Sequence, residues 1–150
     1  MTTRRQVIGH LLGAGGVLCI VPTAVLATPA MRDAAIAELT GGAPVGNGRV
    51  TLTLPAIAEN GLSVYTTVAV DSPMNDSDYV RAIHLLSEEN PIARLATFHL
   101  GPGAGIARVS TNIRLAASQQ VTALVEFSDG SFWQDRRDVV VTLAACIDGG

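Results

Sequence analysis

Two cysteines are the residues of this 150-residue chain with the most distinctive chemistry. Cys19 lies within a long apolar stretch near the N-terminus, whereas Cys146 lies four residues before the last residue, in the sequence Ala144–Gly150. A thiolate is a nucleophile and can hold a group covalently. The polar, glycine-ended sequence around Cys146 offers little apolar surface to bury the thiol, so we expect an accessible sulfur atom there.

Two histidines, an acidic pair and a glycine-rich run are the next candidates. His84 and His99 stand alone in apolar stretches, without the HxH or HxxxH spacing of metal sites and without a nearby cysteine. We interpret Glu88–Glu89 as a solvent-exposed loop. The run Gly101–Gly105 lacks the following helix or the lysine that a phosphate site needs. The sequence therefore predicts no catalytic residue, no metal site and no cofactor site.

The first 27 residues have the pattern of an export signal. Arg4 and Arg5 precede a long apolar stretch, and Val25–Ala27 has the aliphatic and small residues that a signal peptidase requires. Paired arginines are typical of the twin-arginine (Tat) pathway, so we predict cleavage after residue 27 and a periplasmic location. The alternative is an uncleaved membrane anchor, because the stretch approaches spanning length. Its four glycines and His10 argue against that alternative.

The composition of the remaining chain excludes several classes of protein. The chain has no lysine, and removal of Arg4 and Arg5 leaves eight basic residues against 13 acidic ones. This acidic balance and the 4% aromatic content argue against nucleic-acid binding. Removal of residues 1–27 also leaves Cys146 as the only cysteine. Exported proteins normally pair their cysteines, so an odd one predicts an intermolecular disulfide or a free reactive thiol.

A β-rich domain precedes this cysteine and must position it. Pro29 at the start and Gly41–Gly42 at the end predict a helix over residues 29–40. From residue 49 onward, short stretches rich in β-forming residues are bounded by Gly, Pro, Asn or Ser, and Asp129–Gly130 predicts a hairpin. We therefore predict that residues 28–143 form an all-β domain, an immunoglobulin-like β-sandwich of about seven strands preceded by the short helix. The predicted strands are Arg49–Leu54, Leu62–Val70, Tyr79–Leu86, Ala93–Leu100, Ile106–Leu115, Val121–Phe127 and Ser131–Leu143.

Four sequence blocks stand out along the chain: Pro55–Gly61, Asp71–Met74, Ala96–Leu100 and Ser128–Trp133. Together these blocks resemble the SoxY family, the sulfur-carrier subunits of the periplasmic thiosulfate-oxidizing Sox system. They occur in the family's order and extend the resemblance over nearly the whole chain after residue 27. We interpret the blocks themselves as turns, core and interface rather than as catalytic sites. The resemblance implies an immunoglobulin-like sandwich, the same fold that the strand pattern predicts.

The resemblance implies a role for Cys146 that the residues alone do not. In the family, a cysteine on a C-terminal arm, here residues 144–150, holds the substrate covalently. SoxY pairs with a second small β-sandwich protein, SoxZ. The haem enzyme SoxXA conjugates thiosulfate to the cysteine, SoxB hydrolyses the terminal sulfone off as sulfate, and a sulfane dehydrogenase, where present, oxidises the remaining sulfur. The resemblance thus implies that Cys146 is the substrate-attachment residue of a carrier that is not itself an enzyme.

The arm of this chain departs from the family pattern. The usual sequence is Gly-Gly-Cys-Gly-Gly, whereas this chain has Ala-Ala-Cys-Ile-Asp-Gly-Gly over residues 144–150. The alanines and the β-branched Ile147 predict a stiffer and bulkier arm. Either the partner enzymes are adapted to it, or the chain carries another sulfur species.

Two interpretations from other classes also use an exposed thiol. In the first, the chain is an immunoglobulin-like binding module whose Cys146 links a homodimer. In the second, the chain is a thiol redox sensor.

Overall fold

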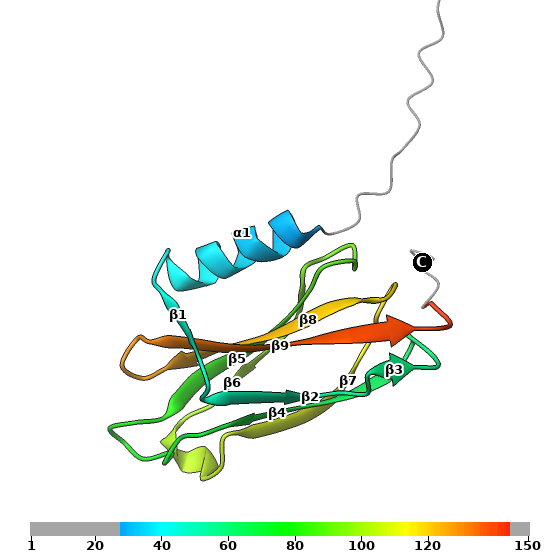
Figure 1. Cartoon of the computed structure of the whole chain (residues 1–150). Coiled ribbons are helices and arrows are strands. Elements are labelled where there is room, and N and C mark those ends of the chain that lie inside the picture. Colours follow the sequence, from blue (N-terminus) through cyan, green and yellow to red (C-terminus); the bar gives the residue numbers. More distant parts are fainter. Residues whose placement is uncertain (1–27, 145–150) are drawn as a thin grey trace, which may run out of the picture.

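The computed structural model describes residues 28–144 (Figure 1). The predicted export signal and both cysteines lie outside the described residues. The described chain folds into one α-helix, one short 3-10 helix and nine strands. These are α1 (Pro29–Thr40), β1 (Val45–Asn47), β2 (Val50–Thr53), β3 (Ile57–Ala58), β4 (Val64–Val70), β5 (Val80–Ser87), β6 (Arg94–His99), η1 (Pro102–Ala104), β7 (Arg108–Ile113), β8 (Gln119–Phe127) and β9 (Phe132–Val141).

Two sheets pack face to face as a sandwich. The larger sheet has the order β1-β9-β8-β5-β6, with β3 pairing to the other half of β9, and the smaller sheet has the order β2-β4-β7. Apolar side chains from both inner faces form the core, which holds the two sheets together because it removes their surface from water. The largest fully buried members include Leu52, Val68, Ile83, Leu85, Val121 and Phe127.

The immunoglobulin-like sandwich that the sequence predicts is confirmed, with each of the seven predicted strands present. The structure adds β1 and β3, of three and two residues. Both pair in parallel with β9. Strands this short carry no recognisable alternation of their own, so only their pairing with β9 defines them.

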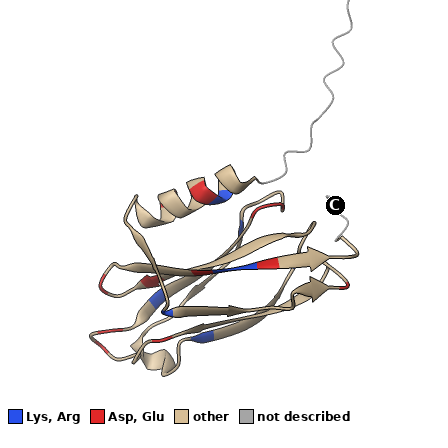
Figure 2. Ribbon diagram, in the orientation of Figure 1, with Lys and Arg blue, Asp and Glu red and all other residues tan. Residues whose placement is uncertain are grey.

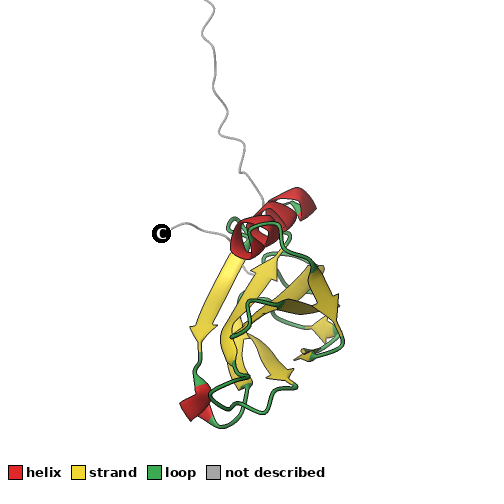
Figure 3. Ribbon diagram, turned by 90° about the vertical axis from the view of Figure 1, so that its left-hand side faces the viewer, coloured by secondary structure: helices red, strands yellow, loops and turns green. Residues whose placement is uncertain are grey.

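The helix α1 lies across the outer face of the larger sheet (Figures 1 and 3). The Thr28 side chain caps the N-terminus of α1, and Pro29 occupies its first turn. Gly41, with a φ of 60°, ends the helix. Its apolar residues pack on Leu86, Leu124 and Phe132 of the sheet. The predicted helix over residues 29–40 is therefore confirmed. The short helix η1 lies on the opposite side of the sandwich (Figure 3). Within residues 28–144, no helix combines the length and apolar character needed to cross a membrane.

The predicted hairpin at Asp129–Gly130 joins β8 to β9. Gly130 has a φ of 81°, which glycine adopts without strain. The Ser131 N–H donates to Asp129 Oδ1 at 2.9 Å, and the Gly130 N–H donates to the Phe127 carbonyl at 3.0 Å. This turn sets the register of β9, the strand that leads to Cys146.

Candidate functional site: the base of the cysteine-bearing segment

Cys146 lies outside the described residues, but the structure fixes the chain up to two residues before it. Strand β9 ends at Val141, close to the predicted end near residue 142 or 143. Thr142, Leu143 and Ala144 follow as an exposed continuation. The site that can be built from the structure is therefore the point from which the cysteine-bearing segment leaves the sandwich.

A ladder of backbone hydrogen bonds holds this exit point. The Val140 N–H donates to the Ala56 carbonyl at 2.9 Å, and the Thr142 N–H donates to the Ala58 carbonyl at 3.0 Å. The Gly61 N–H then donates to the Leu143 carbonyl at 2.8 Å. We call residues 56–61 with residues 140–143 the arm base. The last of these bonds lies three residues before Cys146, so the fold defines where the cysteine segment begins.

Side chains add to this backbone ladder. The Thr142 hydroxyl donates to the Glu59 carbonyl at 3.0 Å, and the Val141 N–H donates to Ser118 Oγ at 2.9 Å. The Gly61 carbonyl accepts from the Leu115 N–H at 2.8 Å. Leu115 is fully buried in the main core. The arm base is thus tied to the interior of the sandwich and is not a loose extension of β9.

Sequence reasoning missed this partner of the cysteine segment. The block Pro55–Gly61 ends in a turn, in which the Asn60 side chain accepts from the Leu62 N–H at 2.8 Å. Nothing in the sequence indicated that the same loop pairs with residues about 80 positions later, because a two-residue strand such as β3 has no pattern of its own. The only available signal was that this loop is one of the blocks that resemble the family.

The two histidines lie on neighbouring strands of the larger sheet. His84 on β5 is buried, and its Nδ1 lies 3.0 Å from the Thr97 hydroxyl on β6. Burial lowers the pKa of His84 below its ordinary value, and the nearby charge of Arg94 lowers that pKa further. His99 is exposed at the end of β6. Among residues 28–144, no group of three His, Cys, Asp or Glu side chains is placed to hold a metal ion.

The interpretation of Glu88 as a solvated loop residue is wrong. Its carboxylate accepts from the Arg32 guanidinium of α1, and the Glu88 side chain is only 16% exposed. Arg32 also donates to Gln120 Oε1 at 3.1 Å and pairs with Asp33 at 2.7 Å. Burial of the Arg32 side chain, at 7% exposure, requires such partners. Glu88 of the acidic pair therefore holds α1 on the sheet through Arg32.

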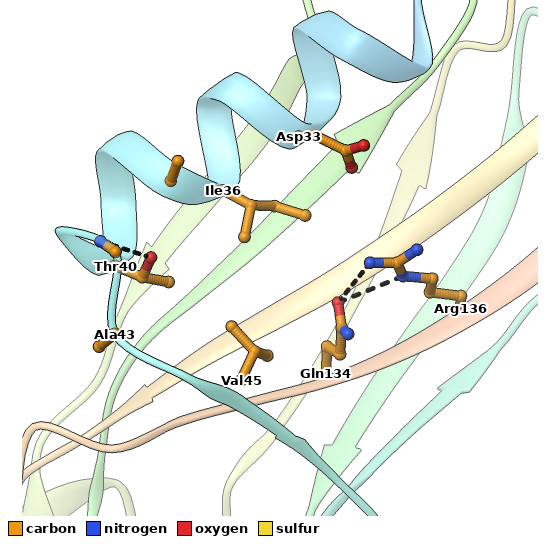
Figure 4. A pocket seen from close by; sticks show the side chains of 9 residues that line it. Asp33, Ile36, Thr40, Ala43, Val45, Gln134 and Arg136 are labelled. Carbon is orange, nitrogen blue, oxygen red and sulfur yellow. Dashed lines mark hydrogen bonds between the residues drawn. The ribbon is translucent and has the colours of Figure 1, made fainter.

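A shallow pocket of about 280 Å³ lies between α1 and β9 (Figure 4). Arg136 points into the space across from Asp33, and its guanidinium donates to Gln134 Oε1 at 3.2 and 3.1 Å. The Thr40 hydroxyl accepts from the Gly42 N–H at 3.2 Å. The pocket lining contains no cysteine or histidine. It is a hollow under the helix lined by one acidic and one basic side chain, Asp33 and Arg136, with no cysteine or histidine to act as a nucleophile.

Comparison with known proteins identifies the family. The model of a family described as sulfur oxidation protein SoxY matches residues 36–146, a range that includes the arm base and Cys146. A solved structure of the sulfur carrier protein SoxY from Chlorobium limicola f. thiosulfatophilum is similar, with 27% sequence identity and a TM-score of 0.63. The match covers 75% of this chain and 92% of that protein.

Other solved structures share the fold alone. A superoxide reductase (neelaredoxin) from Ignicoccus hospitalis has a TM-score of 0.56 at 19% identity, covering 77% of this chain and 94% of that protein. A superoxide reductase from Nanoarchaeum equitans has a TM-score of 0.54 at 12% identity, covering 64% of this chain and 100% of that protein. No curated protein sequence matches the chain. The extent of the family match, from the middle of α1 through the arm base, shows that this chain belongs to the SoxY family of sulfur oxidation proteins.

Proposed function

We propose that this protein is a covalent carrier of sulfur intermediates in thiosulfate oxidation and that Cys146 is the attachment residue. The observation that carries the proposal is the family match over residues 36–146, which includes this cysteine. The ladder of the arm base supports it, because the last fixed carbonyl lies three residues before the thiol. A rigid sandwich can therefore present a group on Cys146 to other proteins.

The loading step is an oxidation that needs an electron acceptor. The Cys146 thiol loses its proton, and its sulfur forms a bond to the outer sulfur of thiosulfate, giving a protein S-thiosulfonate. Two electrons leave in this step, and the haem groups of a SoxXA-type enzyme accept them. Water then attacks the sulfone sulfur in a SoxB-type enzyme, and the bond between the sulfone sulfur and the adjacent sulfane sulfur breaks. Sulfate and two protons depart, and a persulfide anion stays on Cys146.

The cycle ends when the persulfide sulfur is removed. A sulfane dehydrogenase transfers six electrons from the persulfide to its own acceptor while three water molecules supply oxygen and six protons are released. The product is an S-sulfonate on Cys146. Hydrolysis of that group yields a second sulfate and regenerates the thiolate. The carrier contributes the sulfur handle and the enzymes contribute the redox and hydrolytic chemistry.

The proposed setting is the periplasm, reached through the twin-arginine pathway after removal of residues 1–27. Membership of the SoxY family supports this setting and a stable pairing with a SoxZ-like β-sandwich subunit. The proposal includes no membrane anchor and no nucleic-acid partner. The carrier's sequence around the thiol differs from the usual glycine-rich arm, so its partner enzymes are proposed to accept Ile147 beside the loaded sulfur.

Intact-mass measurement of the protein purified from cells fed thiosulfate tests the proposal. We expect thiosulfonate, persulfide or sulfonate adducts on the wild-type chain and none on Cys146→Ser. A mass that shows only a disulfide-linked homodimer supports the binding-module interpretation. A sulfenic acid that forms with peroxide but never an adduct with thiosulfate supports the redox-sensor interpretation.

A further inference from the structure

Exposed apolar side chains concentrate around the arm base. The described residues include eight large apolar side chains that are exposed, and four of these border the exit point. They are Ile57 at 63%, Leu62 at 47%, Val140 at 53% and Leu143 at 63% exposure. Single exposed apolar residues need no explanation, but a group around one functional point does. We call these four residues the arm-base patch.

The ladder explains how these side chains come together. Ile57 and Val140 are register partners in the parallel pair of β3 and β9, so their side chains lie on the same face of the sheet. Their neighbours Ala58 and Val139 point into the interior and are buried. The hydrogen bond between the Gly61 N–H and the Leu143 carbonyl places the backbone next to Leu62 against the backbone of Leu143.

The two segments that carry the patch contain few charged residues. Among residues 56–62 and 139–144, Glu59 is the only charged residue. Figure 2 shows further coloured segments in loops at both ends of the sandwich and on β9, where the exposed Asp138 precedes the patch by two residues. A surface of this kind favours contact with another apolar surface and gives little long-range electrostatic attraction.

The distance from the patch to the thiol limits how a partner can approach. Cys146 is three residues beyond Leu143, and an extended chain spans at most about 3.6 Å per residue, so the two Cα atoms lie within about 11 Å. An enzyme that encloses a group on Cys146 must bring the surface around its active-site entrance at least that close to Leu143. The enzyme surface then lies against the arm-base patch.

We propose that the arm-base patch is the docking surface for the enzymes that act on the group held by Cys146, and that these enzymes have apolar side chains around their active-site entrances. This inference rests on the proposed function. Four side chains are far fewer than the 20 to 30 residues that each partner of a stable complex typically contributes. The patch therefore favours short-lived complexes, as a carrier that visits several enzymes in turn requires.

The test compares enzyme-dependent and enzyme-independent chemistry at the same thiol. Ile57→Thr/Val140→Thr removes apolar surface from the patch and keeps β-branched residues in the strands. Ile106→Thr is the matched control, because Ile106 is 72% exposed and follows η1 at the opposite end of the sandwich (Figure 1). Each full-length mature protein, with its partner subunit, is loaded with thiosulfate by the purified haem enzyme, and its Cys146 is separately labelled with a small maleimide.

We expect the double variant to lose about tenfold in kcat/KM for loading, the loss that removal of roughly 1.4 kcal/mol of contact energy produces. The control should change less than twofold, and maleimide labelling should be unchanged in both variants. Equal loading of all three proteins overturns the docking inference and leaves the proposed function standing. Failure to load even the wild type refutes the proposed function and the inference with it.

Two further results would also overturn the inference. Faster maleimide labelling of the double variant would show that the patch covers the thiol of its own chain. A wild-type homodimer in sedimentation that dissociates in the double variant would show that a second copy occupies the patch.

Discussion

Arg32 is the residue that most constrains where α1 lies. Its guanidinium is buried between the helix and the sheet, and it bonds to Asp33, Glu88 and Gln120. A guanidinium in this position is tolerated because each of its three nitrogens donates to an oxygen acceptor. Removal of one partner leaves the other buried without compensation. The sequence places Arg32 on a surface helix, where an exposed side chain is the ordinary expectation, so its burial could not be predicted.

Replacement of this arginine should destabilise the fold far more than replacement of a surface arginine. We expect Arg32→Met to lower the free energy of unfolding by about 3 kcal/mol, because Glu88 loses its partner in a mostly buried position. Arg94→Met is the control, since Arg94 is 41% exposed and lies 3.6 Å from the exposed Glu38, and it should cost less than about 1 kcal/mol. Urea denaturation checks both values. Equal losses in the two variants would contradict the structure at α1.

His84 predicts a dependence of stability on pH. Burial and the charge of Arg94 lower its pKa in the folded protein, with Glu126 acting in the opposite direction. The unfolded chain therefore takes up a proton at His84 at a higher pH than the folded chain does. Its contribution to stability is complete above the unfolded pKa of about 6.5 and decreases as the pH falls below that value toward the lowered pKa.

We expect the free energy of unfolding of the wild type to decrease between pH 7.5 and pH 5.5, and His84→Gln to show a smaller decrease. Ile106→Thr, at an exposed position without a titratable group, serves as the control and should keep the wild-type slope. Urea titrations at several pH values measure the slopes. A wild-type slope retained in His84→Gln would show that another group is responsible.

The arm base is the element on which the function depends. Strand β9 contributes its N-terminal part to the pairing with β1 and its C-terminal part to the pairing with β3. The bonds of residues 140–143 to residues 56–61 are the last backbone hydrogen bonds found along the described residues. Ala144 is exposed, and no hydrogen bond to it is found within the described residues. The boundary between the scaffold and the cysteine segment therefore falls between these two residues.

Two truncations test this boundary. Removal of residues 144–150 should change the free energy of unfolding by less than about 0.5 kcal/mol, because none of the ladder is lost. Removal of residues 140–150 should cost about 3 kcal/mol, since it deletes the three backbone bonds of the ladder at roughly 1 kcal/mol each. Thermal unfolding measures both. A large loss in the shorter truncation would show that the cysteine segment is packed against the sandwich.

The elements differ in how far the sequence predicts them. The alternation in residues 49–54 and the Asp129–Gly130 turn are local patterns, and both appear in the structure as β2 and the β8–β9 hairpin. The β3 strand and the Glu88–Arg32 pair depend on contacts between residues distant in the sequence, and no local pattern encodes them. The family resemblance predicts Cys146 as the attachment residue. The hydrogen bonds of the arm base that lead to this cysteine can be seen only in the structure.

In the molecule as a whole, the residues that stabilise the fold are distinct from the cysteine that is proposed to carry the function. Its core lies between the two sheets, with α1 over the outer face of the larger one, and the cysteine segment leaves from the end of β9 (Figure 1). Substitution or loading at Cys146 therefore need not disturb the core. The superoxide reductases that share this fold show that the sandwich by itself does not determine function, so the family match that includes the cysteine carries the functional argument.

The most direct test of the central claim is a reconstituted loading reaction followed by peptide mass mapping. The mature protein and its partner subunit are incubated with thiosulfate and the purified haem enzyme, and the peptide that contains residues 138–150 is sequenced by tandem mass spectrometry. We predict one thiosulfonate group per chain on Cys146, absent when the enzyme is omitted and absent in Cys146→Ser. A peptide that stays unmodified after incubation with thiosulfate and the active haem enzyme would contradict the account. So would an adduct that persists in Cys146→Ser.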